Sequence, residues 1–236
     1  MNRPTHHWQD RSVGNTFPTI SHGREMNRLK GWQGMTDSQR VTHPRGLSKR
    51  VARGLFRLLP LSSVVRLGED VRLRRRAHDV SPEELATAET QMLIARLRKV
   101  RRRCRAVGLA APQLGVPLRI CVVADPPSYF QRDSPEWVRA TGRRELAERV
   151  LINPVVTPVG EEKVEFMEFC LSLLGATGAV WRWKTVHVSA LDETGAPVQY
   201  EDTDWAARIV QHEVDHLNGQ VCADLWDRST IMSPGA

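Results

Sequence analysis

The sequence predicts an α+β fold, in which small antiparallel or mixed β-sheets surround a central helix that carries an HExxH motif. Three observations support this prediction. A capped amphipathic helix is expected after Ser81, several short apolar strands follow it, and a second long helix is expected over residues 204–217. Helix, strands and helix in this order are typical of the α+β class.

The first helix is predicted from its start signal and its spacing of apolar residues. Ser81 is a good N-cap, Pro82 suits the first helical position, and Glu84 completes a capping box. Apolar residues then recur at roughly helical spacing, at Leu85, Met92, Leu93, Leu97, Val100 and Cys104. The basic run at residues 101–103 suits the negative end of the helix dipole. After this helix we expect an apolar, glycine-containing loop over residues 107–115.

The apolar runs that follow predict strands and a last helix. Residues 120–123 and 150–152 are expected to form short buried strands, the second ended by Asn153-Pro154, and residues 125–149 a charged loop with room for one helix. Residues 164–174 predict a strand and turn, and residues 185–200 predict a hairpin. Thr203 is the expected cap of the helix Asp204–Leu217, and Gly219 follows its end.

The charge of the chain divides it into two parts. The net charge of +7 comes from the N-terminal quarter, because residues 1–60 contain eleven basic and three acidic residues, whereas the rest contains 23 and 24. We therefore predict a basic, flexible extension over residues 1–63 and one catalytic domain over residues 64–236. Such an extension is most often a solvated tail, but its charge also suits a transient contact with RNA or the ribosome.

The sequence favours a cytoplasmic protein without membrane contact. No apolar run approaches the roughly 18 residues of a membrane helix, and residues 1–10 lack the apolar core of a secretory signal. The four cysteines form no close pair and no CxxC motif, so a reducing compartment is expected. The Arg-rich start also fits an organelle transit peptide, though more weakly.

The strongest functional signal is the HExxH motif in the last helix. His212 and His216 are four residues apart and would lie on one helical face, where two imidazoles can bind one divalent ion. Glu213 would lie close enough to accept a proton from an activated water and to donate it later. The neighbouring residues are mostly small or apolar, so the helix is expected to be buried. The sequence therefore predicts a metal site here.

The third protein ligand of this site could come from either of two cysteines. Cys222 stands where the proteases with the motif HExxHxxGxxH have their last histidine, with Gly219 at the glycine position. Cys170 lies upstream, in the apolar segment Glu168–Ser172. A thiolate with two imidazoles and one open position favours Zn or Fe(II).

Three segments together resemble the peptide deformylase family. Residues 108–113 are similar to its motif G-x-G-L-A-A-x-Q, residues 168–172 to E-G-C-L-S, and residues 211–219 to Q-H-E-x-D-H-L-x-G. The resemblance covers roughly residues 64–232. It implies the family's fold and its activity, which is removal of the N-terminal formyl group from formyl-methionyl nascent polypeptides with release of formate.

The resemblance also implies roles for individual residues. One divalent metal ion, natively Fe(II), with Zn, Ni or Co as alternatives, would be bound by Cys170, His212 and His216. Glu213 would transfer the proton, while the side-chain amide of Gln113 and the backbone N–H of Leu171 would stabilise the oxyanion. The carbonyl of Gly108 would accept the substrate N–H, and an apolar pocket would hold the methionine side chain. That pocket is expected near Val107 and Leu109.

Several positions depart from the family's motifs, and among them Leu173-Leu174 replaces the usual hydrophobic-Pro pair after Ser172. Ala106 replaces the first glycine of the first motif, and Phe169 replaces the glycine before Cys170. These changes leave the predicted chemical residues intact and bear on the substrate range. Two alternatives to a deformylase stay open at this point. One is a divergent zincin-like peptidase that uses Cys222, and the other is a low-activity deformylase relative associated with the ribosome or RNA.

Overall fold

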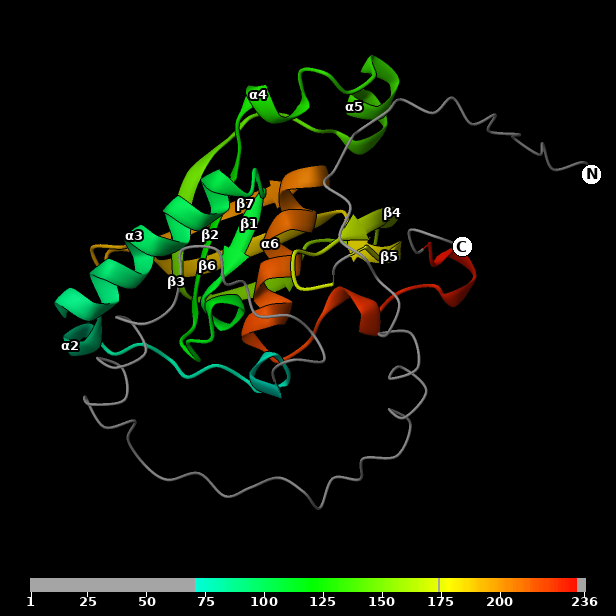
Figure 1. The fold of residues 1–236 in the computed structure, drawn as a ribbon. Helices are drawn as coiled ribbons and strands as arrows, with labels where there is room; N and C mark the ends of the chain where they lie inside the picture. Colours follow the sequence, from blue (N-terminus) through cyan, green and yellow to red (C-terminus); the bar gives the residue numbers. More distant parts are fainter. Residues whose placement is uncertain (1–70, 174, 233–236) are drawn as a thin grey trace, which may run out of the picture. The chain divides into compact units, whose positions relative to one another are not determined.

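The computed structural model describes residues 71–173 and 175–232 (Figure 1). The chain divides into two units, Met1–Gly46 and Leu47–Ala236, and the described residues all belong to the second. The predicted extension over residues 1–63 therefore lies outside the described residues. Among the helices that the structure describes, none is long and apolar enough to pass through a bilayer.

Helices flank a series of antiparallel strands in the described chain. The helices are α2 (Pro82–Leu85), α3 (Ala88–Arg103), α4 (Pro127–Phe130), α5 (Pro135–Thr141) and α6 (Asp204–Leu217), and the strands are β1 (Gly108–Ala110), β2 (Ile120–Asp125), β3 (Leu146–Pro158), β4 (Lys163–Phe169), β5 (Thr177–Trp183), β6 (Thr185–Leu191) and β7 (Pro197–Thr203). One sheet has the order β1-β2-β3-β6-β7, and β4 and β5 form a second. Every pairing between these strands is antiparallel. The predicted α+β class is therefore confirmed.

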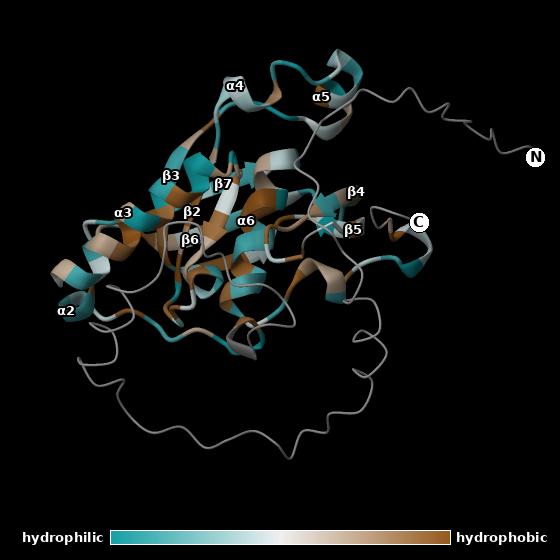
Figure 2. Cartoon of the chain, in the orientation of Figure 1, coloured by the Kyte–Doolittle hydropathy of each residue, from teal (hydrophilic) through white to brown (hydrophobic). Residues whose placement is uncertain are grey.

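The two long helices pack on opposite faces of the five-stranded sheet. Strand β2 is buried along its whole length, and its side chains alternate between two hydrophobic clusters. Cys121 and Val123 pack with residues of α6, whereas Ile120 and Val122 pack with residues of α3. Helix α6 also contacts β5 of the small sheet, so it occupies the middle of the fold. Figure 2 shows hydrophobic residues concentrated on α6 and the central strands.

The predicted first helix is in fact two helices, because the chain turns after one helical turn. Ser81 starts α2 with the predicted capping box: its Oγ accepts the Glu84 N–H (3.2 Å), and its own N–H donates to Glu84 Oε2 (3.1 Å). Thr87 then caps α3 separately. Within α3, Leu93, Leu97 and Val100 are buried, whereas Met92 is 54% exposed and Cys104, the C-cap residue, is exposed, although both fit the predicted apolar pattern.

The middle of the chain differs from its prediction in several segments. The expected loop at residues 107–115 forms β1 and the 3-10 helix Ala111–Leu114, and residues 125–149 contain both α4 and α5. Strand β3 continues past Asn153, where φ is 51° and the register shifts, because the Asn153 side chain bonds the backbone N–H and carbonyl of Val80 (both 2.8 Å). Strand β5 was not predicted.

Helix α6 has the predicted bounds, but different contacts fix its two ends. Thr203 stands at the N-cap position without capping, since its Oγ1 lies 3.1 Å from Thr185 Oγ1. At the other end the Ala77 N–H donates to the Leu217 carbonyl (2.8 Å). Gly219 has a φ of 77°, and a Cβ there would come within 3 Å of backbone atoms of residues 74 and 75. The segment at residues 71–80 therefore closes the C-terminal end of α6.

Candidate metal centre and active site

Helix α6 presents two histidines toward the end of β4. The rings of His212 and His216 lie one turn apart, with centroids separated by 5.0 Å, and His216 is fully buried. Cys170 follows β4 directly, and its Sγ lies 3.3 Å from His216 Nε2. Donor atoms of Cys170, His212 and His216 all lie within 4.8 Å of one another. The structure thus brings together the three residues predicted to bind a metal.

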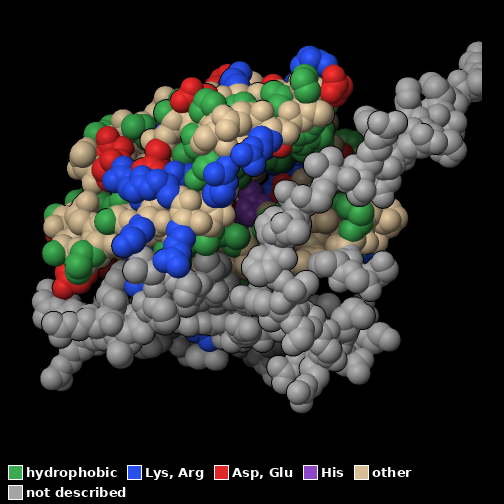
Figure 3. Space-filling view, turned by 45° about the horizontal axis from the view of Figure 1, so that its top comes forward, with side chains coloured by type: hydrophobic (Ala, Val, Ile, Leu, Met, Phe, Trp, Pro, Cys, Tyr) green, Lys and Arg blue, Asp and Glu red, His purple; other side chains and the backbone are tan. Residues whose placement is uncertain are grey.

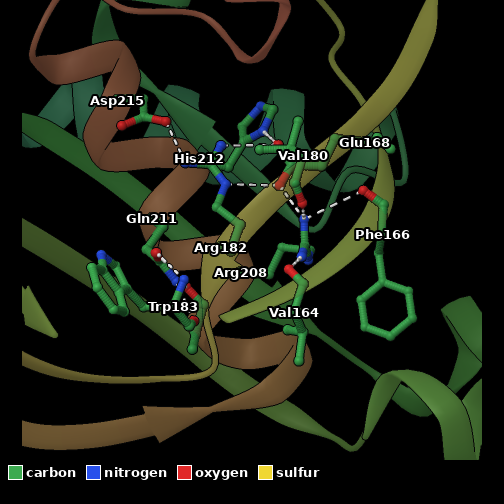
Figure 4. Close-up of polar contacts among 12 residues, drawn as sticks. Val164, Phe166, Glu168, Val180, Arg182, Trp183, Arg208, Gln211, His212 and Asp215 are labelled. Atoms are coloured by element: carbon green, nitrogen blue, oxygen red, sulfur yellow. Dashed lines mark hydrogen bonds and ion pairs between the residues drawn. The ribbon is translucent and has the colours of Figure 1, made fainter. Parts of the chain in front are cut away.

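Glu168 fixes the orientation of His212. Its Oε2 accepts a hydrogen bond from His212 Nδ1 (2.9 Å), which leaves Nε2 free for a ligand (Figure 4). Arg182 donates to both carboxylate oxygens (2.8 and 2.9 Å), and Arg208 donates to Oε1 (2.7 Å). Burial acts to raise the pKa of Glu168, but hydrogen bonds from Arg182 and His212 outweigh it and hold this pKa well below the usual value. Glu168 is therefore ionised and holds the His212 ring in its orientation.

A second group of possible ligands shares this region but is less suited to an ion. It consists of Glu168, His212 and Cys222, with donor atoms that also lie within 4.8 Å of one another. Both oxygens of Glu168 are already bonded to arginines, and one of them also takes His212 Nδ1. The set with Cys170 keeps its donor atoms free of such partners, so it is the better metal site.

The donor set fits a small divalent cation by chemistry and by spacing. Ligand bonds of about 2.0–2.3 Å in a tetrahedral arrangement place neighbouring donor atoms roughly 3.5 Å apart, which is close to the 3.3 Å between Cys170 Sγ and His216 Nε2. The Cys170 pKa lies well below its usual value. The hydrogen bond from Cys222 is the main cause, with His216 and His212 contributing, and together they outweigh burial. A thiolate with two imidazoles suits Zn or Fe(II).

Glu213 lies beside this donor set with one oxygen free. It is buried, and among the described residues Oε2 has no hydrogen-bond partner. Burial is the main cause that raises the pKa of Glu213 to about 7, against the opposing effect of His212 and His216. A Cβ on Gly108 would lie 2.2 Å from Glu213 Oε1, so the glycine makes room for this carboxylate. A carboxyl group of this kind can take up and release a proton near neutral pH.

Gln113 and the turn after Cys170 supply hydrogen-bond donors to the same site. Gln113 is buried, and its Oε1 accepts the Ala110 N–H (2.9 Å), which points its Nε2 toward Ser172 Oγ (3.3 Å) and Cys170 Sγ (3.8 Å). The Ser172 N–H also donates to Cys170 Sγ (3.4 Å). Leu171, between them, lines the pocket described next.

A pocket of about 270 Å³ opens onto these groups. It is lined by Cys104, Arg105, Ala106, Val107, Gly108, Gln113, Met167, Glu168, Phe169, Cys170, Leu171, Trp205, Arg208, Ile209, His212 and Glu213. Figure 3 shows histidine surface in a recess of this face, bordered by Lys and Arg side chains. Val107 and Gly108 lie where the sequence placed them. Leu109 does not: the segment expected to be a loop forms β1, and the alternation of side chains along this strand turns Leu109 into the cluster under α3, where it is fully buried. Phe169 lies at the pocket and is 58% exposed.

Three charged residues around the histidines were missed in the sequence. Arg182 pairs with Glu168 and with Asp215, and Arg208 bonds the carbonyls of Val164 (2.7 Å) and Val180 (3.0 Å) besides Glu168. The signal was present, because an arginine inside an apolar helix or strand needs a buried acceptor. Identifying that acceptor requires the packing of β4 and β5 on α6, which sequence spacing does not give.

Comparison with known proteins agrees with this geometry. A family model described as "Polypeptide deformylase" matches residues 61–230. The mitochondrial peptide deformylase of Homo sapiens is 40% identical over 173 residues, which cover 73% of this chain and 70% of that protein. Peptide deformylase 1A, chloroplastic/mitochondrial, of Arabidopsis thaliana is 39% identical over 164 residues, which cover 70% of this chain and 61% of that protein. The chain thus spans about three fifths of the length of this plant relative.

Solved structures show the same likeness. A class I type b peptide deformylase from Acinetobacter baumannii with Met-ala-ser bound is 32% identical, with a TM-score of 0.61, and the match covers 70% of this chain and 97% of that one. A peptide deformylase from Ehrlichia chaffeensis is 29% identical, with a TM-score of 0.61, over 72% of this chain and 90% of that one. With a family model that matches most of its length and a cysteine and two histidines gathered beside a buried glutamate, the chain belongs to the peptide deformylase family.

Proposed function

We propose that this protein is a metal-dependent hydrolase that removes the N-terminal formyl group from formyl-methionyl polypeptides. Water cleaves the formamide bond, and the products are formate and a free N-terminal amine. The observation that carries this proposal is the combination of Cys170, His212 and His216 with the free carboxylate oxygen of Glu213 at the end of one pocket. Family membership supports the substrate class, and a related enzyme has been solved with Met-ala-ser bound.

Metal binding, proton transfer and stabilisation of the oxyanion are assigned to different residues of the site. Cys170, His212 and His216 would hold one divalent ion, and Fe(II), Zn, Ni or Co suits these donors. Such an ion supplies Lewis-acid activation of the attacking water and of the formyl group. Glu213 accepts the proton of that water and passes it to the departing amine. Its pKa of about 7 favours both the uptake and the release of this proton. The donors for the developing oxyanion are the Gln113 amide and the Leu171 N–H.

Substrate binding is assigned to the rest of the pocket. The Gly108 carbonyl would accept the peptide N–H, and the apolar side chain of Val107 would contact the methionine. Trp205 and Ile209, both on α6, extend this apolar lining on the helix side. Apolar side chains of this kind suit the unbranched thioether side chain of methionine.

The alternative peptidase that uses Cys222 has less support. The ligand group that contains Cys222 depends on Glu168, whose oxygens are bonded to arginines. No contact of the described residues favours a relative that only binds RNA. Formyl-methionyl nascent chains are therefore the proposed partner. Residues 1–63, proposed as an extension to the domain at 64–236, would add a transient ribosome contact through their charge. A reducing compartment such as the cytoplasm suits the buried free cysteines.

The proposal is tested by metal content and formate release from formyl-Met-Ala-Ser. Wild type is expected to retain one divalent ion per chain and to release formate. Cys170→Ala should lose both the ion and the activity, because it removes a ligand, whereas the matched variant Cys222→Ala should keep both. The opposite pattern would favour the peptidase-like site, and an ion-loaded wild type without formate release would refute the deformylase proposal.

A further inference from the structure

A phenylalanine lies at the pocket beside the proposed metal ligand and has no part in the reaction described above. Phe169 is the last residue of β4 and directly precedes Cys170. It lines the pocket and is 58% exposed, so it belongs to the open part of the pocket and not to the core. The motif E-G-C-L-S, which this segment resembles, has a glycine here and offers no side chain. Phe169 therefore adds an apolar surface that the reacting groups themselves do not require.

The side chains of β4 that line the pocket come from both faces of the strand. Glu168 points toward α6, because it bonds Arg208 (2.7 Å) and His212 (2.9 Å) of that helix (Figure 4). Side chains alternate along a strand, so Met167 and Phe169 lie on the opposite face. All three residues of β4 line the pocket. The pocket thus runs past the edge of β4, whose single strand partner among the described residues is β5.

This arrangement places the second residue of a bound peptide beside Phe169. The methionine side chain is assigned above to the α6 side of the pocket, where Trp205 and Ile209 extend the apolar lining. A peptide that lies extended along the edge of β4 turns successive side chains to opposite faces. Its second side chain then points away from α6, to the face of Met167 and Phe169. This step rests on the proposed function, because that function assigns the methionine to its place.

We propose that Phe169 determines specificity for the residue that follows the formyl-methionine. Its ring and the Met167 side chain form an apolar contact surface for the second side chain of the peptide, which favours large apolar and aromatic residues over alanine. A contact of this kind is made equally in the bound substrate and in the transition state. It therefore lowers KM and leaves kcat largely unchanged.

Formate release from three peptides tests this contact. Metal-loaded wild type is compared on formyl-Met-Phe-Ser, formyl-Met-Leu-Ser and formyl-Met-Ala-Ser. We expect kcat/KM to be about 3–10-fold higher for the phenylalanine peptide than for the alanine peptide, which is the effect of one partly covered aromatic contact. Most of this difference should be in KM, and the leucine peptide should lie between the other two.

Two variants and a matched control assign the preference to Phe169. In Phe169→Ala the preference for the phenylalanine peptide should disappear, whereas Phe169→Leu should keep part of it, because leucine retains an apolar side chain. Trp181→Ala is the control. Trp181 is also 58% exposed and lies on the same face of the small sheet, but it is outside the set of described residues that line the pocket. Its removal should leave the preference unchanged.

The outcomes separate this inference from the proposed function. Equal kcat/KM values for the three peptides in wild type would overturn the role of Phe169 and leave the deformylase proposal intact, as would a preference that persists in Phe169→Ala. The wild-type comparison needs no variant, and Phe169→Leu replaces Phe169→Ala if the latter does not retain its ion.

A binding measurement covers the case in which no peptide releases formate. The deformylase proposal then fails, and calorimetric titration with the unformylated peptides Met-Phe-Ser and Met-Ala-Ser tests the contact instead. Tighter binding of Met-Phe-Ser that is lost in Phe169→Ala would support the contact, and equal binding of the two peptides to wild type would overturn it.

Discussion

Two buried carboxylates near His212, one bonded to its ring and one next to it in the chain, have opposite properties. Glu168 has all its oxygens bonded to His212 and two arginines, and its pKa is lowered. Glu213 has an oxygen without a partner, and burial raises its pKa to about 7. The first is therefore fixed in its charge and holds the site in place, whereas the second can change its charge during a reaction. Separate environments for neighbouring carboxyl groups are a general way to divide such roles.

Replacing Glu213 tests its role in proton transfer. Glu213→Gln keeps the shape of the side chain but cannot accept the proton, so kcat/KM for formyl-Met-Ala-Ser should fall by about 10²–10⁴. The bound ion should remain, because Glu213 is not among the three ligands. Metal analysis and formate release check both expectations, with the exposed Glu201→Gln as control. A variant that loses its ion, or one that keeps its rate, would contradict the assignment.

Gly108 is expected to be coupled to Glu213 through space. A Cβ at position 108 would lie 2.2 Å from Glu213 Oε1 and 2.6 Å from Cδ, so Gly108→Ala should displace the carboxylate. Overpacking of this kind costs about 1–3 kcal/mol. Denaturant unfolding of Gly108→Ala, Glu213→Ala and the double variant measures the coupling. Most of the destabilisation should disappear in the Glu213→Ala background. If the changes in the free energy of unfolding of the two single variants simply add, the contact between the two residues does not affect stability.

Residues with a chemical signature could be predicted from the sequence, and residues that depend on packing could not. The spacing of His212 and His216 holds on any helix, so their shared face was predictable. Leu109 was placed in the pocket because its neighbours were read as a loop, whereas alternation along β1 turns it into the core. Phe169 was recognised as a departure from the family, and the structure adds its position at the pocket.

Helix α6 and the small β4–β5 sheet form one unit because buried ion pairs join them. Glu168 on β4, Arg182 on β5 and Arg208 on α6 meet at distances of 2.7–2.9 Å, and each side chain is at most 5% exposed (Figure 4). Arg182 continues to Asp215, one residue before the second histidine. The ligand Cys170 follows β4 directly. The network therefore holds the cysteine and the histidines at a fixed separation.

Breaking this network should destabilise the protein strongly. Arg208→Met leaves Glu168 with one arginine fewer and frees three backbone carbonyls, so a loss of about 3–5 kcal/mol in the free energy of unfolding is expected. Arg139→Met is the control, because its pair with Glu136 is about 70% exposed on both sides, and such pairs contribute about 0–1 kcal/mol. Urea unfolding compares the two variants. Similar values for both would show that the buried network adds no more than a surface pair.

Elements with clear periodicity and turn residues were predicted well, and elements shaped by tertiary contacts were not. The hairpin of β6 and β7 and the bounds of α6 follow from alternation, a turn at Gly195 and a glycine at the helix end. Strand β5 was missed because Arg182, which the pattern counts as polar, is buried in it. Strand β3 extends past Asn153-Pro154 because the Asn153 side chain finds both its partners on Val80, far away in the sequence.

At the scale of the whole molecule, metal binding and folding should be linked. Cys170 and the histidines come from elements that meet only in the folded state, so an ion bound by all three stabilises that state. At an ion concentration of 100 times Kd, the gain is about 2.7 kcal/mol. Chelation should therefore lower the melting temperature, and added Zn should restore it. His216→Ala should show no such response. An unchanged melting temperature of wild type on complete metal removal would contradict the site.

The closure of α6 by the segment at residues 71–80 has a consequence for biosynthesis. The Ala77 N–H and the backbone beside Gly219 meet although they are about 140 positions apart, and the helix between them carries the histidines. Such a contact can form only after nearly the entire domain has left the translating machinery, and closing so large a loop is slow. A newly made copy would then acquire its catalytic competence late, as one of the last events of its own maturation.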